Sequence, residues 1–288
     1  MYGFLLLSVA LMTVNTGLTK IFQQSVKFDL KSMAMYNLVN ALLACGIFFV
    51  TAGFRIQVNL PTLIYSLIYA AIICVNLSAQ ILALALVPVP VTTLMSVAGG
   101  VLIPAVFGVV YYGEPLTWRL GLSIGLILGA TALPLSGGMG GVSWKGAAAC
   151  LAMFLLGGAS VILVQLYARA DGVCDANSFF FLTNLVIAFL CLTLILFKKG
   201  ESSFRELVHL FSLRQLGMIA GKTALANGCS MLQVPILRQM AASTYAVLNS
   251  SLSLLGSVAV SVLWFREKQT KKGLLAVLLA IAALIVNP

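Results

Sequence analysis

The chain has 288 residues, of which 61% are hydrophobic and only 8% are charged, and its mean hydropathy is +1.09. This balance excludes a soluble globular protein and is typical of an integral membrane protein. The formal net charge of +10 comes from bases scattered through short segments beside apolar runs. Such a distribution favours topology signals and lipid-headgroup anchors over a nucleic-acid partner.

Apolar runs of about 18 or more residues recur along the chain, and each is long enough to cross a hydrocarbon core of about 30 Å as a helix. Lipid offers an open backbone no hydrogen-bond partner, and the runs lack the alternation of barrel strands, so we predict helices. The first run has no basic leader or cleavage site, which favours a spanning helix over a signal peptide. The predicted helices are 2–22, 32–52, 62–86, 90–112, 119–136, 145–168, 177–197, 215–237, 241–264 and 271–287.

A glycine-rich segment near the middle, Ser136-Gly-Gly-Met-Gly-Gly-Val-Ser143, is the one stretch with the composition of a linker. It divides the chain into a five-helix half at 1–136, a linker at 137–143 and a second five-helix half at 144–288. The fold class that we predict is therefore an all-α integral membrane protein with ten transmembrane helices.

The two halves carry a weak internal repeat. A shift of the second half by 153 residues superposes three polar positions, Glu267 on Glu114, Thr270 on Thr117 and Gln233 on Gln80. Because each half has an odd number of spans, the second copy enters the membrane with the opposite orientation. The pattern thus predicts two inverted five-helix repeats, an architecture common among secondary transporters.

The longest connection, 198–214, contains a capping-box pattern, Ser203-Phe-Arg-Glu206, followed by apolar residues on one helical face. We predict a short helix lying in the membrane interface. It carries His209, the only histidine, which we expect to face solvent or headgroups; a proton-relay role is the alternative.

A polar corner, Gly113-Glu114-Pro-Leu-Thr117 leading to Gly121, joins the fourth predicted helix to the fifth. With Ala85-Leu86 at the end of the third helix and Pro104 in the fourth, it resembles the EamA-like family of the drug/metabolite transporter superfamily. The resemblance covers the whole chain but weakens in the second half. The departures there are Arg266 at the corner glycine, Lys268 and Gln269 in place of Pro-Leu, and Ser257 at the proline position.

The resemblance implies a secondary transporter of small metabolites that works by alternating access through a central cavity between two repeats. Relatives carry amino acids, nucleotide sugars, sugar phosphates, purines or drugs, so the fold leaves the substrate open. We predict that transport proceeds without covalent chemistry.

All seven acidic residues fall in predicted loops or corners. Export of hydrophobic cations in exchange for protons ordinarily needs a carboxylate inside the membrane, so the pattern disfavours it. Glu114 and Glu267 lie just before helix starts, with Thr117 and Thr270 at capping spacing. We predict structural corners here; a pair of coupling acids is the alternative.

Lys222 is the one charged residue in the interior of a predicted span, away from its ends, and an intramembrane lysine is a functional candidate. We predict that it counters a carboxylate or phosphate on an anionic or zwitterionic substrate. The alternative is a side chain that snorkels back to the basic 198–214 connection.

Buried amides and hydroxyls in lipid must face the protein interior, where they line a cavity or bond between helices. They occur on the first four and the sixth to ninth predicted helices, which favours a polar cavity lined by those helices. With Lys222, the predicted cavity residues are Asn15, Asn37, Tyr69, Asn76, Gln80, Gln165, Asn227, Gln233, Tyr245 and Asn249.

The fifth and tenth predicted helices carry stripes of small residues that predict close helix packing within the bundle, a dimer contact being the alternative. The stripes are Gly121, Gly125 and Gly129, and Gly273, Ala276, Ala280 and Ala283. Gly99-Gly100 and the helix prolines are either hinges for alternating access or ordinary determinants of shape.

No P-loop, metal-ligand cluster or nucleophile–base arrangement occurs in the sequence, so we predict a non-enzyme without cofactor or metal. Five of the six cysteines lie in apolar spans, as expected of small packing residues rather than disulfides. The predicted partners are a small-molecule substrate and the lipid bilayer, with the chain a monomer or a homodimer. A lipid-linked sugar flippase, an exporter of drugs or quaternary cations, and a non-transporting structural or receptor-like protein are the rival functions.

We predict a multi-pass protein of the cell membrane, specifically a bacterial inner membrane. Two indications of its orientation disagree: the family places both termini in the cytoplasm, whereas the basic residues of the loops place them outside. The odd-numbered connections contain Lys20, Lys27, Lys31, Lys145, Lys198, Lys199, Arg205, Arg214, Arg266, Lys268, Lys271 and Lys272, and the even-numbered ones only Arg55, Arg119, Arg169 and Arg238.

Overall fold

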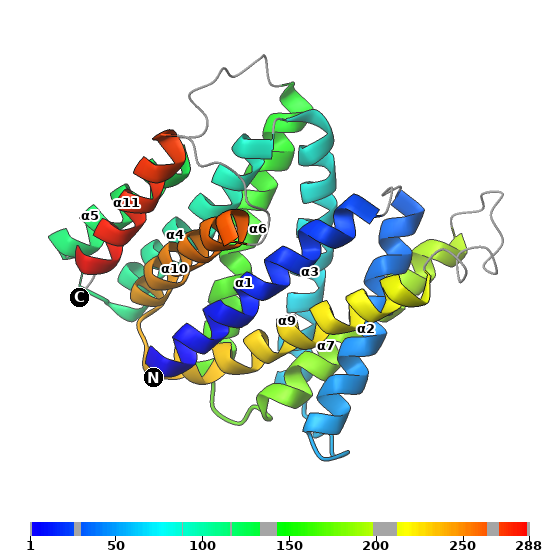
Figure 1. The fold of residues 1–288 in the computed structure, drawn as a ribbon. Coiled ribbons are helices and arrows are strands. Elements are labelled where there is room, and N and C mark those ends of the chain that lie inside the picture. Colours follow the sequence, from blue (N-terminus) through cyan, green and yellow to red (C-terminus); the bar gives the residue numbers. More distant parts are fainter. Residues whose placement is uncertain are drawn as a thin grey trace. The chain divides into compact units, whose positions relative to one another are not determined.

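The computed structural model of the protein describes residues 2–25, 30–87, 89–115, 117–132, 143–197, 212–263 and 271–286. Within these ranges the chain is helical apart from short connections, and no strand occurs. The helices, drawn in chain order in Figure 1, are α1 (Tyr2–Ser25), α2 (Leu30–Thr51), α3 (Leu60–Leu86), α4 (Val89–Tyr112), α5 (Trp118–Ala132), α6 (Trp144–Arg169), α7 (Ala176–Phe197), α9 (Leu213–Gln239), α10 (Ala242–Leu263) and α11 (Lys271–Val286).

Five of these helices contain segments long and apolar enough to cross a membrane. The segments are Ala34–Thr51, Leu60–Gln80, Leu94–Tyr112, Trp144–Arg169 and Ala176–Ile195. The protein is therefore an all-α membrane protein. Whether all ten helices cross the bilayer stays a prediction.

Each described helix begins within two residues of the start predicted from the apolar runs. The runs locate helices well because the length of a span and the need to bond its backbone internally leave few alternatives. Three predictions fall outside the described residues: the linker up to residue 142, the interfacial helix with His209, and the second corner with Glu267 and Thr270.

The chain forms two compact units. One comprises Met1–Val9, Ile72–Arg169 and Gln233–Pro288, and the other Ala10–Ala71 and Ala170–Leu232. We call them the first and the second unit. Each combines segments from before and after the central linker, so the compact units differ from the two halves predicted as repeats, and the repeat itself stays a prediction.

In the first unit, α4 and α6 pack closely at a pair of glycines. A Cβ atom added to Gly99 would lie 2.7 Å from the Cα of Phe154 and still closer to its carbonyl oxygen. A Cβ added to Gly158 would lie 2.6 Å from the Gly99 carbonyl oxygen and would overlap Ile103. Gly99 is thus a packing residue of α4, because only hydrogen leaves room for the backbone of α6.

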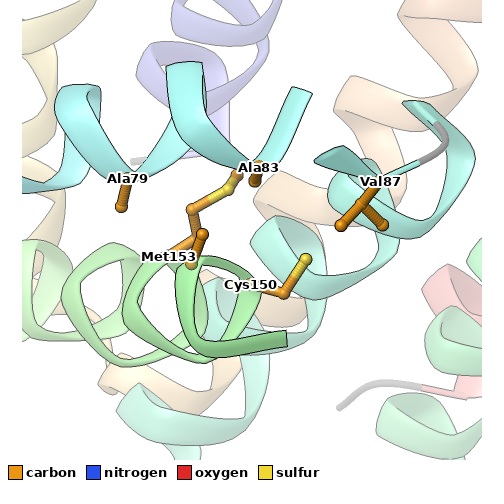
Figure 2. Packing of buried hydrophobic residues seen from close by; sticks show 6 residues of the cluster. Ala79, Ala83, Val87, Cys150 and Met153 are labelled. Carbon is orange, nitrogen blue, oxygen red and sulfur yellow. The ribbon is translucent and has the colours of Figure 1, made fainter. Parts of the chain in front are cut away.

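The end of α3 packs against the start of α6 in the same unit. Figure 2 shows Met153 and Cys150 of α6 directed towards Ala79 and Ala83 of α3 and towards Val87, which directly follows α3. A Cβ at Gly146 would lie 2.6 Å from Val87 Cγ2, so small residues again set the approach. All six cysteines are free thiols, and Cys150 here acts as a small apolar side chain, as predicted.

The small-residue stripes of α5 and α11 differ in how far they are buried. The two helices pack side by side (Figure 1), and Ala276, Ala280 and Ala283 of α11 are buried. On α5, in contrast, Gly121 and Gly125 are exposed and have open space around them. The structure describes no packing contact at these two glycines, and their predicted packing stays untested. The buried face of α5 is instead formed by Leu120, Ser123, Ile127, Ala130 and Thr131.

In the second unit, aromatic side chains join α2, α3 and α7. Phe48 of α2 stacks on Phe180 of α7 with ring centroids 5.4 Å apart, and Tyr69 of α3 lies 5.5 Å from Phe179. The Ser66 hydroxyl also donates a hydrogen bond to the Phe179 carbonyl oxygen at 3.1 Å. Tyr69, predicted from the sequence as a cavity residue, thus lies within an aromatic core.

Candidate functional site

The most unusual side chain of the described helices is Lys222, which lies in α9 about 13 Å of helix rise beyond Leu213. Only 6% of its surface is exposed. Its Nζ donates a hydrogen bond of 2.9 Å to the hydroxyl of Tyr36 in α2 and lies 5.0 Å from the centroid of that ring. This contact favours the predicted interior position over the snorkelling alternative.

A second hydrogen bond links the same two helices one residue further along α9. The Thr223 hydroxyl lies 2.6 Å from Asn40 Oδ1 and 2.7 Å from the carbonyl oxygen of Ile219. Tyr36 and Asn40 are four residues apart and therefore share a face of α2, opposite adjacent residues of α9. From the sequence, Lys222 was predicted as a cavity residue, whereas Tyr36 and Asn40 belonged to the polar span residues expected to line a cavity or to bond between helices.

Asn227 extends the polar face of α9 by a further turn beyond Thr223. Its side chain is 8% exposed. Within the part of the chain that the structure describes, its Nδ2 atom donates no hydrogen bond, although it is buried. A buried amide without a partner loses its hydration without compensation, so an exception of this kind requires an explanation.

The remaining predicted cavity residues are divided between the two units. In the second unit, Asn15 and Asn37 are half-buried. In the first unit, Gln165 and Tyr245 are buried, whereas Gln80 is exposed. Asn76, Gln233 and Asn249 are half-buried there. The role of Gln80 as a cavity residue stays a prediction.

The corner after α4 contains the predicted cap at Thr117 and a further contact of Glu114 that was not predicted. Gly113 ends α4 with a φ of 65°, and Thr117 accepts a hydrogen bond from the Leu120 N–H at 3.2 Å, so it caps α5 as predicted. Glu114 caps the start of α10. Its Oε2 accepts hydrogen bonds from the Ser243 hydroxyl at 2.5 Å and the Ser243 N–H at 3.4 Å.

Two arginines predicted only as topology signals exchange hydrogen bonds between the ends of α6 and α9. Arg169 donates from Nη2 to the Met240 carbonyl oxygen at 3.0 Å and from Nε to that of Leu237 at 3.4 Å. Arg238 donates to the Ala168 carbonyl oxygen at 2.7 Å. Each guanidinium thus donates hydrogen bonds at the C-terminal end of the other helix, where carbonyl oxygens lack partners within the helix and the helix dipole is negative. This pairing was not visible in the sequence because the partners are backbone atoms.

Replacing Arg169 with alanine should lower the free energy of unfolding by about 2 kcal/mol, because hydrogen bonds from a charged donor are lost at a half-buried site. The guanidinium also lies 4.2 Å from the centroid of the Tyr112 ring, a further contact that is lost. Thermal or denaturant unfolding in detergent measures the change. The control is Arg119→Ala, which removes an exposed arginine and should cost less than about 0.5 kcal/mol. Equal effects of the two substitutions would contradict the capping role.

Comparisons with known proteins define the fold and leave the activity open. No family model matches the chain, and no curated protein matches it. One solved crystal structure is similar with a TM-score of 0.71 at 14% sequence identity, over 98% of this chain and 94% of that one. Its description names no activity, so the similarity shows the fold alone.

Proposed function

We propose that the protein is a secondary transporter of small polar metabolites, anionic or zwitterionic, in the cell membrane and specifically a bacterial inner membrane. The observation that carries this proposal is the buried Lys222 ammonium on the Tyr36 hydroxyl. A positive charge costs free energy inside a membrane protein, so its retention in an apolar helical protein supports a role in binding a charged solute.

The proposal takes its mechanism from the resemblance at the Gly113–Gly121 corner and from the predicted repeats. Two inverted five-helix repeats, 1–136 and 144–288, move against each other and open a central cavity alternately to the two sides. Lys222 counters the acidic group of the substrate, and polar side chains of the neighbouring helices bind the remainder. A reporter fused to Pro288 tests the orientation, on which the two sequence indications disagree.

The test combines ligand binding with flux. Purified protein is screened by thermal shift against amino acids, nucleosides, sugar phosphates, small carboxylates and quaternary amines, and compounds that stabilise it are then assayed by counterflow in proteoliposomes. We expect stabilisation and saturable flux with anionic or zwitterionic metabolites. A preference for quaternary amines, an absence of any water-soluble ligand as for a lipid flippase, or an absence of saturable flux would each overturn the proposal.

A further inference from the structure

In the second unit, hydrogen bonds join the connection between α2 and α3 to the connection between α6 and α7. The Asn59 side chain donates from Nδ2 to the Gly172 carbonyl oxygen at 2.6 Å. The N–H of Cys174 donates to the hydroxyl of Thr62, in the first turn of α3, at 2.9 Å. One connection belongs to the first predicted repeat and the other to the second, so these bonds tie the two repeats together.

The pairing is reciprocal, because a hydroxyl on each side accepts an N–H of the other. Ser178, in the first turn of α7, accepts the N–H of Gln57 at 3.0 Å and donates to Asp175 Oδ1 at 2.5 Å. Thr62 and Ser178 are both fully buried. Separation of the two sides would break the three hydrogen bonds between them, and each break disfavours the separated state about fivefold.

Next to these hydrogen bonds, aromatic rings fill the contact between α2 and α7. The side chains of Phe48, Phe179 and Phe180 are at most 3% exposed, and Phe48 stacks on Phe180. A path for a water-soluble solute between α2 and α7 would hydrate these rings, and each ring disfavours that state about tenfold to a hundredfold. Together the rings and hydrogen bonds exceed the roughly ten-thousandfold preference that a ligand needs to reverse a conformational equilibrium.

We propose, resting on the proposed transport function, that this contact is a fixed joint between the two predicted repeats. The joint consists of the three hydrogen bonds between the connections and the aromatic rings beside them. In it α2 and α7 stay paired through the whole transport cycle, and the repeats move about the joint rather than separating at it. A gate between α2 and α7 would instead require the same hydrogen bonds to break in every cycle.

A reversible cross-link tests whether the joint opens. Thr62 Oγ1 lies 2.9 Å from the Cys174 nitrogen, so the two Cα atoms are at most about 7 Å apart and Thr62→Cys brings a thiol within disulfide reach of the native Cys174. The purified variant is oxidised, or bridged with a short bis-methanethiosulfonate where the direct bond does not form, and the loss of free thiols measures the cross-link. Counterflow of glutamate, succinate and a hexose phosphate is then measured in proteoliposomes.

We expect the cross-linked protein to transport within about twofold of the same sample after reduction, since a joint that stays closed adds nothing to the barrier. The control is Thr62→Cys combined with Cys174→Ala, which cannot form the cross-link and should be insensitive to the oxidant. Loss of transport on cross-linking that returns on reduction would overturn the inference and leave the proposed function standing. Absence of saturable flux for every class of solute, in the wild-type protein as well, would instead overturn the proposed function and this inference with it.

Discussion

Replacement of Gly158 with alanine is expected to lower the free energy of unfolding by about 3 kcal/mol, the upper end of the cost of overpacking. The new methyl group would lie 2.6 Å from the Gly99 carbonyl oxygen and would overlap the Cβ of Ile103. Neither neighbour can rotate away, since one is backbone and the other is the branch point of a β-branched side chain. The helices α4 and α6 would have to separate along their contact, with loss of dispersion energy.

Adjacent glycines of the same helices provide matched controls. Around Gly100 an added Cβ meets nothing within 4 Å, and around Gly157 it meets only the Ser96 carbonyl oxygen at 3.9 Å. Alanine at either position should be neutral or stabilise by up to about 1 kcal/mol through its helix propensity. Gly99→Ala should resemble Gly158→Ala. Reversible unfolding in mixed detergent measures all four; indistinguishable stabilities would show that this crossing is not as close as described.

The contrast among these glycines shows what the sequence could and could not predict. The positions of the helices followed from the length and polarity of the apolar runs, and the starts agree within two residues. Which face of each helix packs depends on its partner, which no single run encodes. The same spacing of small residues is therefore exposed at Gly121 and Gly125 of α5 and buried at Ala276 and Ala280 of α11.

The candidate site, too, could be predicted from the sequence only in part. Lys222 was predictable because a charge inside an apolar run is costly and rare. Its hydrogen bond to Tyr36 brings together residues 186 positions apart, and Glu114 with Ser243 are 129 apart. Such pairs depend on how helices are arranged and leave no local pattern. The hydrogen bonds of Arg169 and Arg238 were the least predictable from the sequence. Their acceptors are main-chain carbonyls, which are present at every position.

Replacement of Lys222 with methionine should reduce kcat/KM for anionic solutes by about 100-fold, which corresponds to the loss of one buried contact between opposite charges of about 3 kcal/mol. Methionine keeps the length and apolar stem of lysine and removes only the charge and the donors. Uptake by proteoliposomes under initial-rate conditions measures the change. Lys222→Arg, which keeps the charge but not the compact ammonium, should retain part of the activity.

The stability of the same variant separates a transport role from a structural one. A lysine kept to hold α9 against α2 through Tyr36 would make the methionine variant less stable. If Lys222 instead serves to bind the solute, its buried charge costs desolvation free energy in the solute-free protein. Methionine should then leave the thermal midpoint unchanged or raise it, while transport is lost. Lys145→Met, which removes an exposed charge at the start of α6, should change neither quantity. Undiminished transport in Lys222→Met, or a parallel fall of transport and stability, would exclude Lys222 as the residue that binds the solute.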